Sequence, residues 1–243
     1  NVSLSFVIDQ GDDTAIASGP FDSHSVTISS DAMGTLKFSG HGGSSAQSAM
    51  DGTAAGDIWN NTLGISGISA AAAGNDSLYY TLPEVMDGLA ITASMSPGRA
   101  AQETHTSFGL VYTGYDGLTL KYGNGDSGTP TAEIESTTMM ASYAIGSLTV
   151  GVSQTEADKT GAANRVVDAF QIAYTVTDDI SVTYGNETFD LTGNATDEEV
   201  EAIGVSYTSG GMTISANQYE AKGAGTTSGA KSDKWSLSAA FAF

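Results

Sequence analysis

The side chains of this sequence that could do chemistry are mostly carboxylates. The chain of 243 residues has 28 Asp and Glu residues against 8 Lys and Arg residues, which gives a formal net charge of −20. It has no cysteine and only three histidines, His24, His41 and His105. The sequence therefore offers no thiolate site, no disulfide and no histidine-rich metal site, and it lacks the basic residues that a nucleic-acid-binding face needs.

No arrangement of these residues marks a catalytic site. The sequence has no nucleophile with a spaced base and no glycine-rich loop between a strand and a helix. A hydrolase would need a serine, a histidine and an acid close together, and His41 beside Ser44 and Ser45 is the only support for one. We predict that the protein is not an enzyme and that it needs no cofactor.

Three acidic clusters could attract cations, since carboxylate oxygens suit Ca²⁺ and Mg²⁺. They comprise Asp9, Asp12 and Asp13; Asp178 and Asp179; and Asp197, Glu198, Glu199 and Glu201. None has the spacing of a known calcium-binding loop. We expect at most loosely bound Ca²⁺ or Mg²⁺ at the acidic loops and no specific metal site.

The polar segment 41–75 is too long for a hairpin connection. It contains Asp51 and Asp57, and it also contains apolar residues such as Ile58 and Trp59. If the segment folds against the inside of a wall, the apolar side chains are buried and the two carboxylates face water. The alternative is that both are ordinary solvated loop acids.

The elements that must position these residues are hairpins, because the chain contains an internal repeat. Tyr80, Tyr112, Tyr143, Tyr174 and Tyr207 follow one another at intervals of 32, 31, 31 and 33 residues. Around each tyrosine, large apolar residues alternate with small or polar ones. This period of two indicates strands, each followed by a tight turn, a second strand and a longer polar loop.

The pattern favours a transmembrane β-barrel, in which short turns at one end alternate with long loops at the other and aromatic residues gather beside the short turns. The polar face consists of Ser, Thr, Gly and Ala, whereas soluble sheets usually carry long charged side chains. The alternative is a soluble or surface-attached β-rich structural or adhesive protein without a channel. Fourteen strands are predicted, at 1–9, 22–30, 35–40, 77–82, 89–96, 104–113, 118–125, 136–145, 147–155, 166–176, 179–186, 199–208, 211–220 and 232–243.

The alternation also assigns side chains to the two faces of the wall. The lipid face is predicted to include Leu36, Phe38, Leu118, Leu120, Ile180, Val182, Ile214, Leu237 and Phe241. The opposite, polar face is predicted to include Lys37, His41 and Lys121. A lysine on that face keeps its water, whereas a lysine in the middle of the lipid face would be costly.

The chain resembles the general porins of alphaproteobacterial outer membranes, the group related to the Rhodobacter porins. The resemblance covers nearly the whole chain. It rests on the hairpin SVTISSDAMGTLKF (residues 25–38), the long loop 41–75, the segment DSLYYTLPEVMDGLAITASMSPG (residues 76–98) and the last strand ending in Phe243. Single pieces are weakly specific, and their order and spacing carry the likeness.

The resemblance implies one β-barrel domain over residues 1–243, in the bacterial outer membrane, with loop 41–75 folded into its lumen as the constriction. It implies a sixteen-stranded homotrimer, with two N-terminal strands missing from this sequence. The alternative is a barrel of fourteen strands. The function implied is passive diffusion of small hydrophilic solutes and ions, with outer-membrane lipid and lipopolysaccharide as neighbours. Asp51, Asp57, Lys37, His41 and Lys121 are the predicted constriction residues, and we expect a moderate preference for cations.

Overall fold

The structure is a computed structural model of residues 1–243. It describes all residues except 9–20, 51, 62, 66, 68–70, 72–73, 99–102 and 243. No helix in the described part of the chain is both long and apolar enough to cross a membrane.

Fourteen strands make up nearly all of the regular structure. They are β1 (Val2–Ile8), β2 (Phe21–Ser30), β3 (Gly34–His41), β4 (Ser77–Thr81), β5 (Leu89–Ser96), β6 (His105–Tyr112), β7 (Leu118–Thr129), β8 (Ala132–Ile145), β9 (Leu148–Lys159), β10 (Arg165–Thr177), β11 (Ile180–Leu191), β12 (Glu198–Ser209), β13 (Met212–Lys222) and β14 (Lys231–Phe241). Two short 3₁₀ turns, η1 (Ile58–Asn60) and η2 (Ala224–Thr226), lie in connections.

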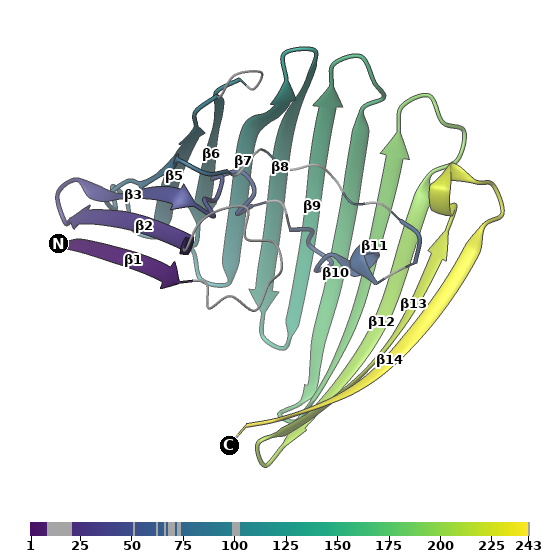
Figure 1. Cartoon of the computed structure of the whole chain (residues 1–243). Coiled ribbons are helices and arrows are strands. Elements are labelled where there is room, and N and C mark those ends of the chain that lie inside the picture. Colours follow the sequence, from purple (N-terminus) through teal and green to yellow (C-terminus); the bar gives the residue numbers. More distant parts are fainter. Residues whose placement is uncertain are drawn as a thin grey trace.

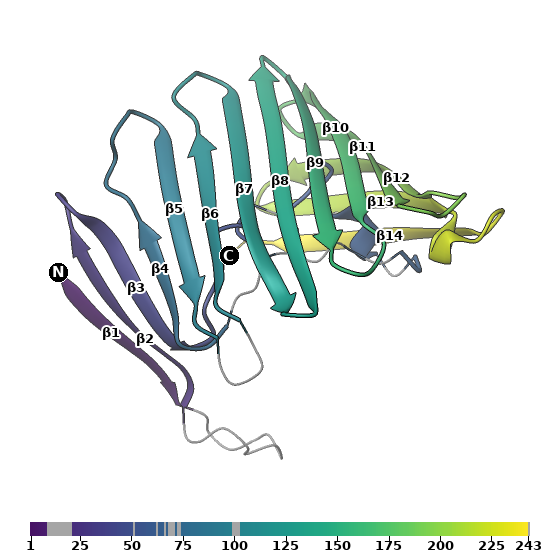
Figure 2. The same cartoon turned by 90° about the horizontal axis from the view of Figure 1, so that it is seen from above.

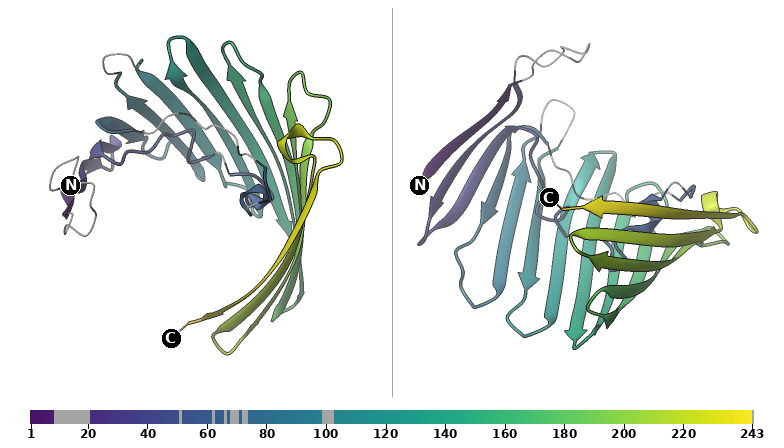
Figure 3. Two further views of the ribbon diagram at one scale, coloured as in Figure 1. Left: turned by 45° about the vertical axis from the view of Figure 1, so that its right-hand side comes forward. Right: turned by 90° about the horizontal axis from the view of Figure 1, so that it is seen from below.

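The strands form one antiparallel sheet in which each strand pairs with its neighbours in the sequence, from β1 to β14. Figures 1 and 2 show this sheet as a single curved wall. It curls into an incomplete cylinder, seen most clearly in Figure 3, and β1 and β14 form its two edges. The all-β, antiparallel fold with fourteen strands is as the sequence predicts.

Several strands are longer than predicted at the end that carries the long loops. β7 continues to Thr129 and β8 begins at Ala132, whereas the predicted strands end at 125 and begin at 136, so the connection is tight. β9 and β11 continue to Lys159 and Leu191, whereas the predicted strands end at 155 and 186. The prediction was wrong there because the apolar alternation stops while the backbone pairing continues through polar residues.

The two faces of the wall differ as the alternation predicts. On β9, Gly151, Ser153 and Thr155 are buried, whereas Val150 and Val152 are 39% and 57% exposed. Register extends this division across the sheet, because Val152 lies opposite Phe170 on β10. The exposed apolar face points outward and the face of small residues points into the cylinder.

Ile172 and Thr175 on β10 test this assignment. Ile172 lies on the outward face and is 43% exposed, and Thr175 lies on the inward face with an exposed side chain. Ile172→Arg should destabilise the folded protein in a bilayer by about 2–4 kcal/mol if the site is near midplane, since the guanidinium would enter hydrocarbon. Thr175→Arg should cost far less because the inward face meets water. Urea unfolding in lipid vesicles measures both, and equal losses would contradict the assignment.

Candidate functional site

The described residues of the connection between β3 and β4, which spans 42–76, lie inside the cylinder. Figures 1 and 3 show them along the inner side of the wall as far as β11. These residues hydrogen-bond to inward side chains of β5, β6, β8, β9, β10, β11 and β14. We call this connection the inner loop.

Glycines on the inward face let the inner loop approach the wall closely. A Cβ on Gly109 would lie 2.8 Å from the carbonyl oxygen of Ala46, and one on Gly123 would lie 3.1 Å from Cβ of Met50. A Cβ on Gly185 would lie 3.1 Å from Cβ of Ala55. The small residues that mark the polar face in the sequence therefore have a packing reason, since larger side chains would push the loop away.

Gln47 fixes the first part of the inner loop. Its side chain is fully buried; Nε2 donates to Oγ1 of Thr138 at 3.1 Å, and Oε1 accepts a bond from the amide of Ala71 at 2.7 Å. The amide of Ala46 donates to the hydroxyl oxygens of Ser94 and Ser107, each at 3.0 Å. The buried polar groups here are thus matched to partners, as burial requires.

Glu187 on β11 fixes the far part of the loop. The side chain is fully buried, and its carboxylate accepts bonds from the amides of Ile58 at 3.0 Å and Trp59 at 2.7 Å. It also accepts a bond from the hydroxyl of Thr53. Three donors from one short stretch of chain converge on this carboxylate, so it orients the turn that contains η1.

Apolar packing completes the attachment of the far part. Ile58, Leu63 and Ile65 of the loop lie in one buried cluster with wall residues such as Phe189 and Val200. Next to this cluster the wall binds the loop backbone again. Oγ of Ser232 donates to the carbonyl of Leu63 at 2.9 Å, and Nζ of Lys234 donates to that of Asn61 at 3.2 Å.

An ion pair lies beside the same buried cluster. Arg165 Nη2 lies 2.5 Å from a carboxylate oxygen of Glu198, and the guanidinium lies 5.0 Å from the centre of the Phe189 ring. The other oxygen of Glu198 accepts a bond from the amide of Gly225, at 2.8 Å. The connection between β13 and β14 is thereby held beside the inner loop.

A cylinder with an apolar outside, a polar inside and a loop fixed within it has the form of a membrane channel. The sequence profile of the Gram-negative porin family matches residues 1–243. The chain belongs to the Gram-negative porin family. It is an outer-membrane protein that forms a water-filled channel for the passive diffusion of small hydrophilic solutes and ions, and its family consists of channels that are not enzymes.

Solved structures of other porins share this fold. A porin refined at 1.8 Å resolution is 17% identical, with a TM-score of 0.64, over 90% of this chain and 81% of the other. The anion-selective porin from Comamonas acidovorans is 14% identical, with a TM-score of 0.60, over 91% and 74% of the two chains. The trimer form of OmpT from Vibrio cholerae is 18% identical, with a TM-score of 0.59, over 84% and 72%. No curated protein matches the sequence significantly.

The family assignment decides between the two readings of the sequence, in favour of the channel and against the soluble or adhesive protein. The inward position of the long loop is also as predicted. Among the predicted constriction residues of this porin, Lys37 and Lys121 lie on the inward face. Lys37 is two positions from the buried Ser39 on β3, and Lys121 is two positions from Gly123, which lies against Met50 of the loop. His41 ends β3 where the loop begins.

The two acids of the loop have different outcomes. Asp51 lies outside the described residues. Asp57 is partly exposed and has a left-handed backbone with φ of 55°. Its carboxylate accepts a bond from the amide of Thr53 at 2.9 Å, and its own amide donates to the hydroxyl of Thr53 at 2.8 Å. Asp57 therefore closes the turn formed by residues 53–57, next to the carboxylate of Glu187.

Sequence reasoning gave no inward role to Glu187, Glu198 and Arg165, which lie just outside the predicted strands. The signal that could have found Glu187 is the alternation of Gly185, Glu187 and Phe189, which continues the inward face of β11. In the described part of the chain no group of three or more His, Asp or Glu side chains is placed to hold a metal ion. The cluster of Asp9, Asp12 and Asp13 lies outside that part.

Glu187→Ala tests the attachment of the inner loop. The change removes the acceptor of three hydrogen bonds and should weaken the attachment by at least about 2 kcal/mol, because bonds to charged groups are each worth about 1.5–3 kcal/mol. The loop should then leave its place part of the time, and single-channel recordings should show larger or more variable conductance.

Asp190→Ala is the matched control, because Asp190 lies on the same strand and is exposed on the outward face. It removes a carboxylate without a loop contact and should leave the recordings unchanged. Identical recordings from the two variants would show that Glu187 does not hold the loop.

Proposed function

We propose that this protein is a general-diffusion porin of the alphaproteobacterial, Rhodobacter-type group whose narrowest part lies beside the inner loop. The observation that carries the proposal is the attachment of the loop along the inner face from β5 to β11 through Gln47 and Glu187. A loop held against one side of a cylinder narrows the lumen and leaves a passage along the other side. The channel selects solutes by their size and by the electrostatic field in the passage, and it carries out no reaction.

The residues proposed to border the passage are those predicted from the sequence. Asp51 and Asp57 belong to the inner loop. Lys37 and His41 belong to β3, just before the loop begins, and Lys121 belongs to β7. Charged groups in a narrow water-filled passage act on ions without needing direct contact, because the low-dielectric walls focus their field.

We further propose that the complete barrel has sixteen strands. In the described sheet β1 pairs only with β2, and β14 pairs only with β13. Each edge then leaves a row of backbone N–H and C=O groups without a strand partner, which hydrocarbon cannot satisfy. Two strands beyond the given residues, between β14 and β1, would pair with both edges and close the wall.

The wall also has a sector suited to contact with other subunits. β1, β3, β4, β5 and β6 have only 5–8 residues each, whereas β7–β14 have 11–14. The outward residues of the short sector include Leu4, Phe6 and Phe38, which are 40–62% exposed. We propose that this sector packs in a homotrimer while the longer strands face lipid and lipopolysaccharide; native mass measurement on mildly extracted protein separates trimer from monomer.

The proposed function predicts size-limited uptake. Vesicles that contain the intact protein should swell in solutions of small neutral sugars, and the rate should fall steeply as the sugar becomes larger. The physical reason is that the passage beside the loop admits hydrated molecules only up to its own width. Vesicles with protein denatured before insertion serve as the control. Equal swelling rates for small and large sugars, or no swelling, would contradict the proposal.

A further inference from the structure

The net charge of −20 is distributed unevenly between the two faces of the wall. In the strands of the described chain, most carboxylates occupy the same alternate positions as the exposed apolar residues. They therefore lie on the outward face. Glu156 follows Val150 and Val152 in the even positions of β9, and Glu199 and Glu201 precede Ile203 in the odd positions of β12. Such charges stand on the outside of the barrel, beyond its apolar band.

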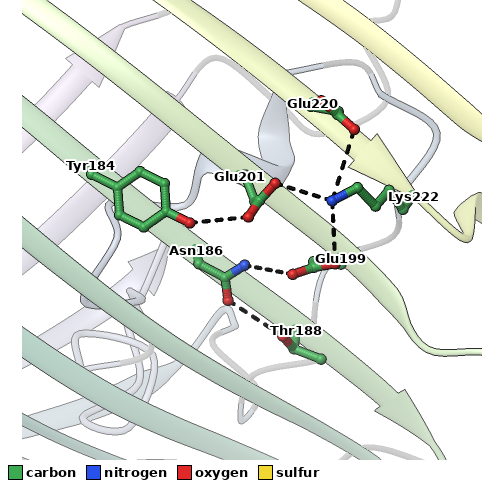
Figure 4. Close-up of polar contacts among 7 residues, drawn as sticks. All are labelled: Tyr184, Asn186, Thr188, Glu199, Glu201, Glu220 and Lys222. Carbon is green, nitrogen blue, oxygen red and sulfur yellow. Dashed lines mark hydrogen bonds and ion pairs between the residues drawn. The ribbon is translucent and has the colours of Figure 1, made fainter.

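Figure 4 shows one group of these outward side chains on β11, β12 and β13. Nζ of Lys222 lies 3.1 Å from a carboxylate oxygen of Glu201 and 3.8 Å from those of Glu199 and Glu220. The hydroxyl of Tyr184 donates to Glu201 at 3.0 Å. These carboxylates are therefore paired with Lys222, and Glu201 also with Tyr184, on the outward face of the wall. Solutes in the channel do not contact that face.

The inward face has a different balance. In the strands that the structure describes, its carboxylates are Glu187, held by three donors of the inner loop, and Glu198, paired with Arg165. The described part of the inner loop adds Asp57, whose carboxylate accepts a bond from the amide of Thr53. Three lysines also point inward: Lys37, Lys121 and Lys234. Within the described residues no carboxylate lies within 4.0 Å of the amino group of Lys37 or Lys121.

Acids at the ends of the barrel have less influence on the passage. Asp31, Asp87, Asp116 and Asp178 lie in the short turns at one end, where they are exposed to bulk solvent. Their field is screened over a Debye length of about 8–10 Å at physiological salt. The lysines lie inside the cylinder, where low-dielectric walls focus the field on the passage.

We infer that the channel prefers anions, against the sign of the chain's own net charge, and that Lys37 and Lys121 are specificity-determining residues. This inference rests on the proposed function, because it needs an open passage beside the inner loop. The solutes favoured are small anions, such as chloride and small carboxylates, over cations of similar size. It reverses the preference for cations expected from the sequence, which relied on the net charge and on Asp51 and Asp57.

Reversal potentials in a planar bilayer test the inference on the intact protein under a KCl gradient. The unmodified protein should give the sign of chloride preference. The double variant Lys37→Gln/Lys121→Gln should shift the potential toward potassium, since two inward charges are lost. The preference should also weaken at high salt, because the screening length falls to about 3 Å at 1 M.

The matched control is Glu156→Gln/Glu220→Gln, which removes two outward charges from the same chain. It should leave the reversal potential unchanged. A potassium preference in the unmodified protein would overturn the inference, as would a shift in the control as large as that of the lysine variant. Absence of any conductance would instead overturn the proposed function, so the two failures are distinguishable.

Discussion

The structure depends on one constraint, which is that hydrocarbon offers no partner for a backbone N–H or C=O group. A chain that crosses a bilayer as strands must satisfy these groups within a single curved sheet. Such a wall has only two faces, and successive side chains take them in turn. Parity therefore decides whether each residue meets lipid or the interior. The large apolar side chains lie outside, and the small buried cluster among the described residues lies where the inner loop covers the wall.

This constraint explains how much of the fold could be read from the sequence. The fourteen strands and the faces of residues such as Leu120 and Lys121 follow from a period of two, which is a local signal. The ends of the longer strands could not be read, because beyond the apolar band both faces are polar and alternation by hydropathy disappears. β9 continues from Gln154 to Lys159 in backbone pairing with β8, through residues that are polar or small.

The candidate site was predictable only in outline for the same reason. The length and apolar content of segment 41–75 indicated that it packs inside the barrel, and the small inward residues agreed. The residue that holds it, Glu187, lies in a stretch that looked like a loop and contacts Thr53, which is 134 positions away. Such a contact depends on the register of eight strands and on the path of the loop. Local sequence patterns predict neither of these. Net charge is an incomplete guide for a similar reason, because composition does not say which face carries a carboxylate.

The central claim is that the inner loop lies against the wall while the passage runs beside it, and a cross-link tests this most directly. The chain has no cysteine, and Cβ of Ala54 lies 3.5 Å from the position of a Cβ on Gly151. This separation suits a disulfide. Ala54→Cys/Gly151→Cys should therefore oxidise fully and conduct equally well before and after oxidation. Ala54→Cys/Val152→Cys, with the second cysteine on the outward face, should not cross-link. Failure of the first pair to link, or loss of conductance once it has linked, would contradict the account.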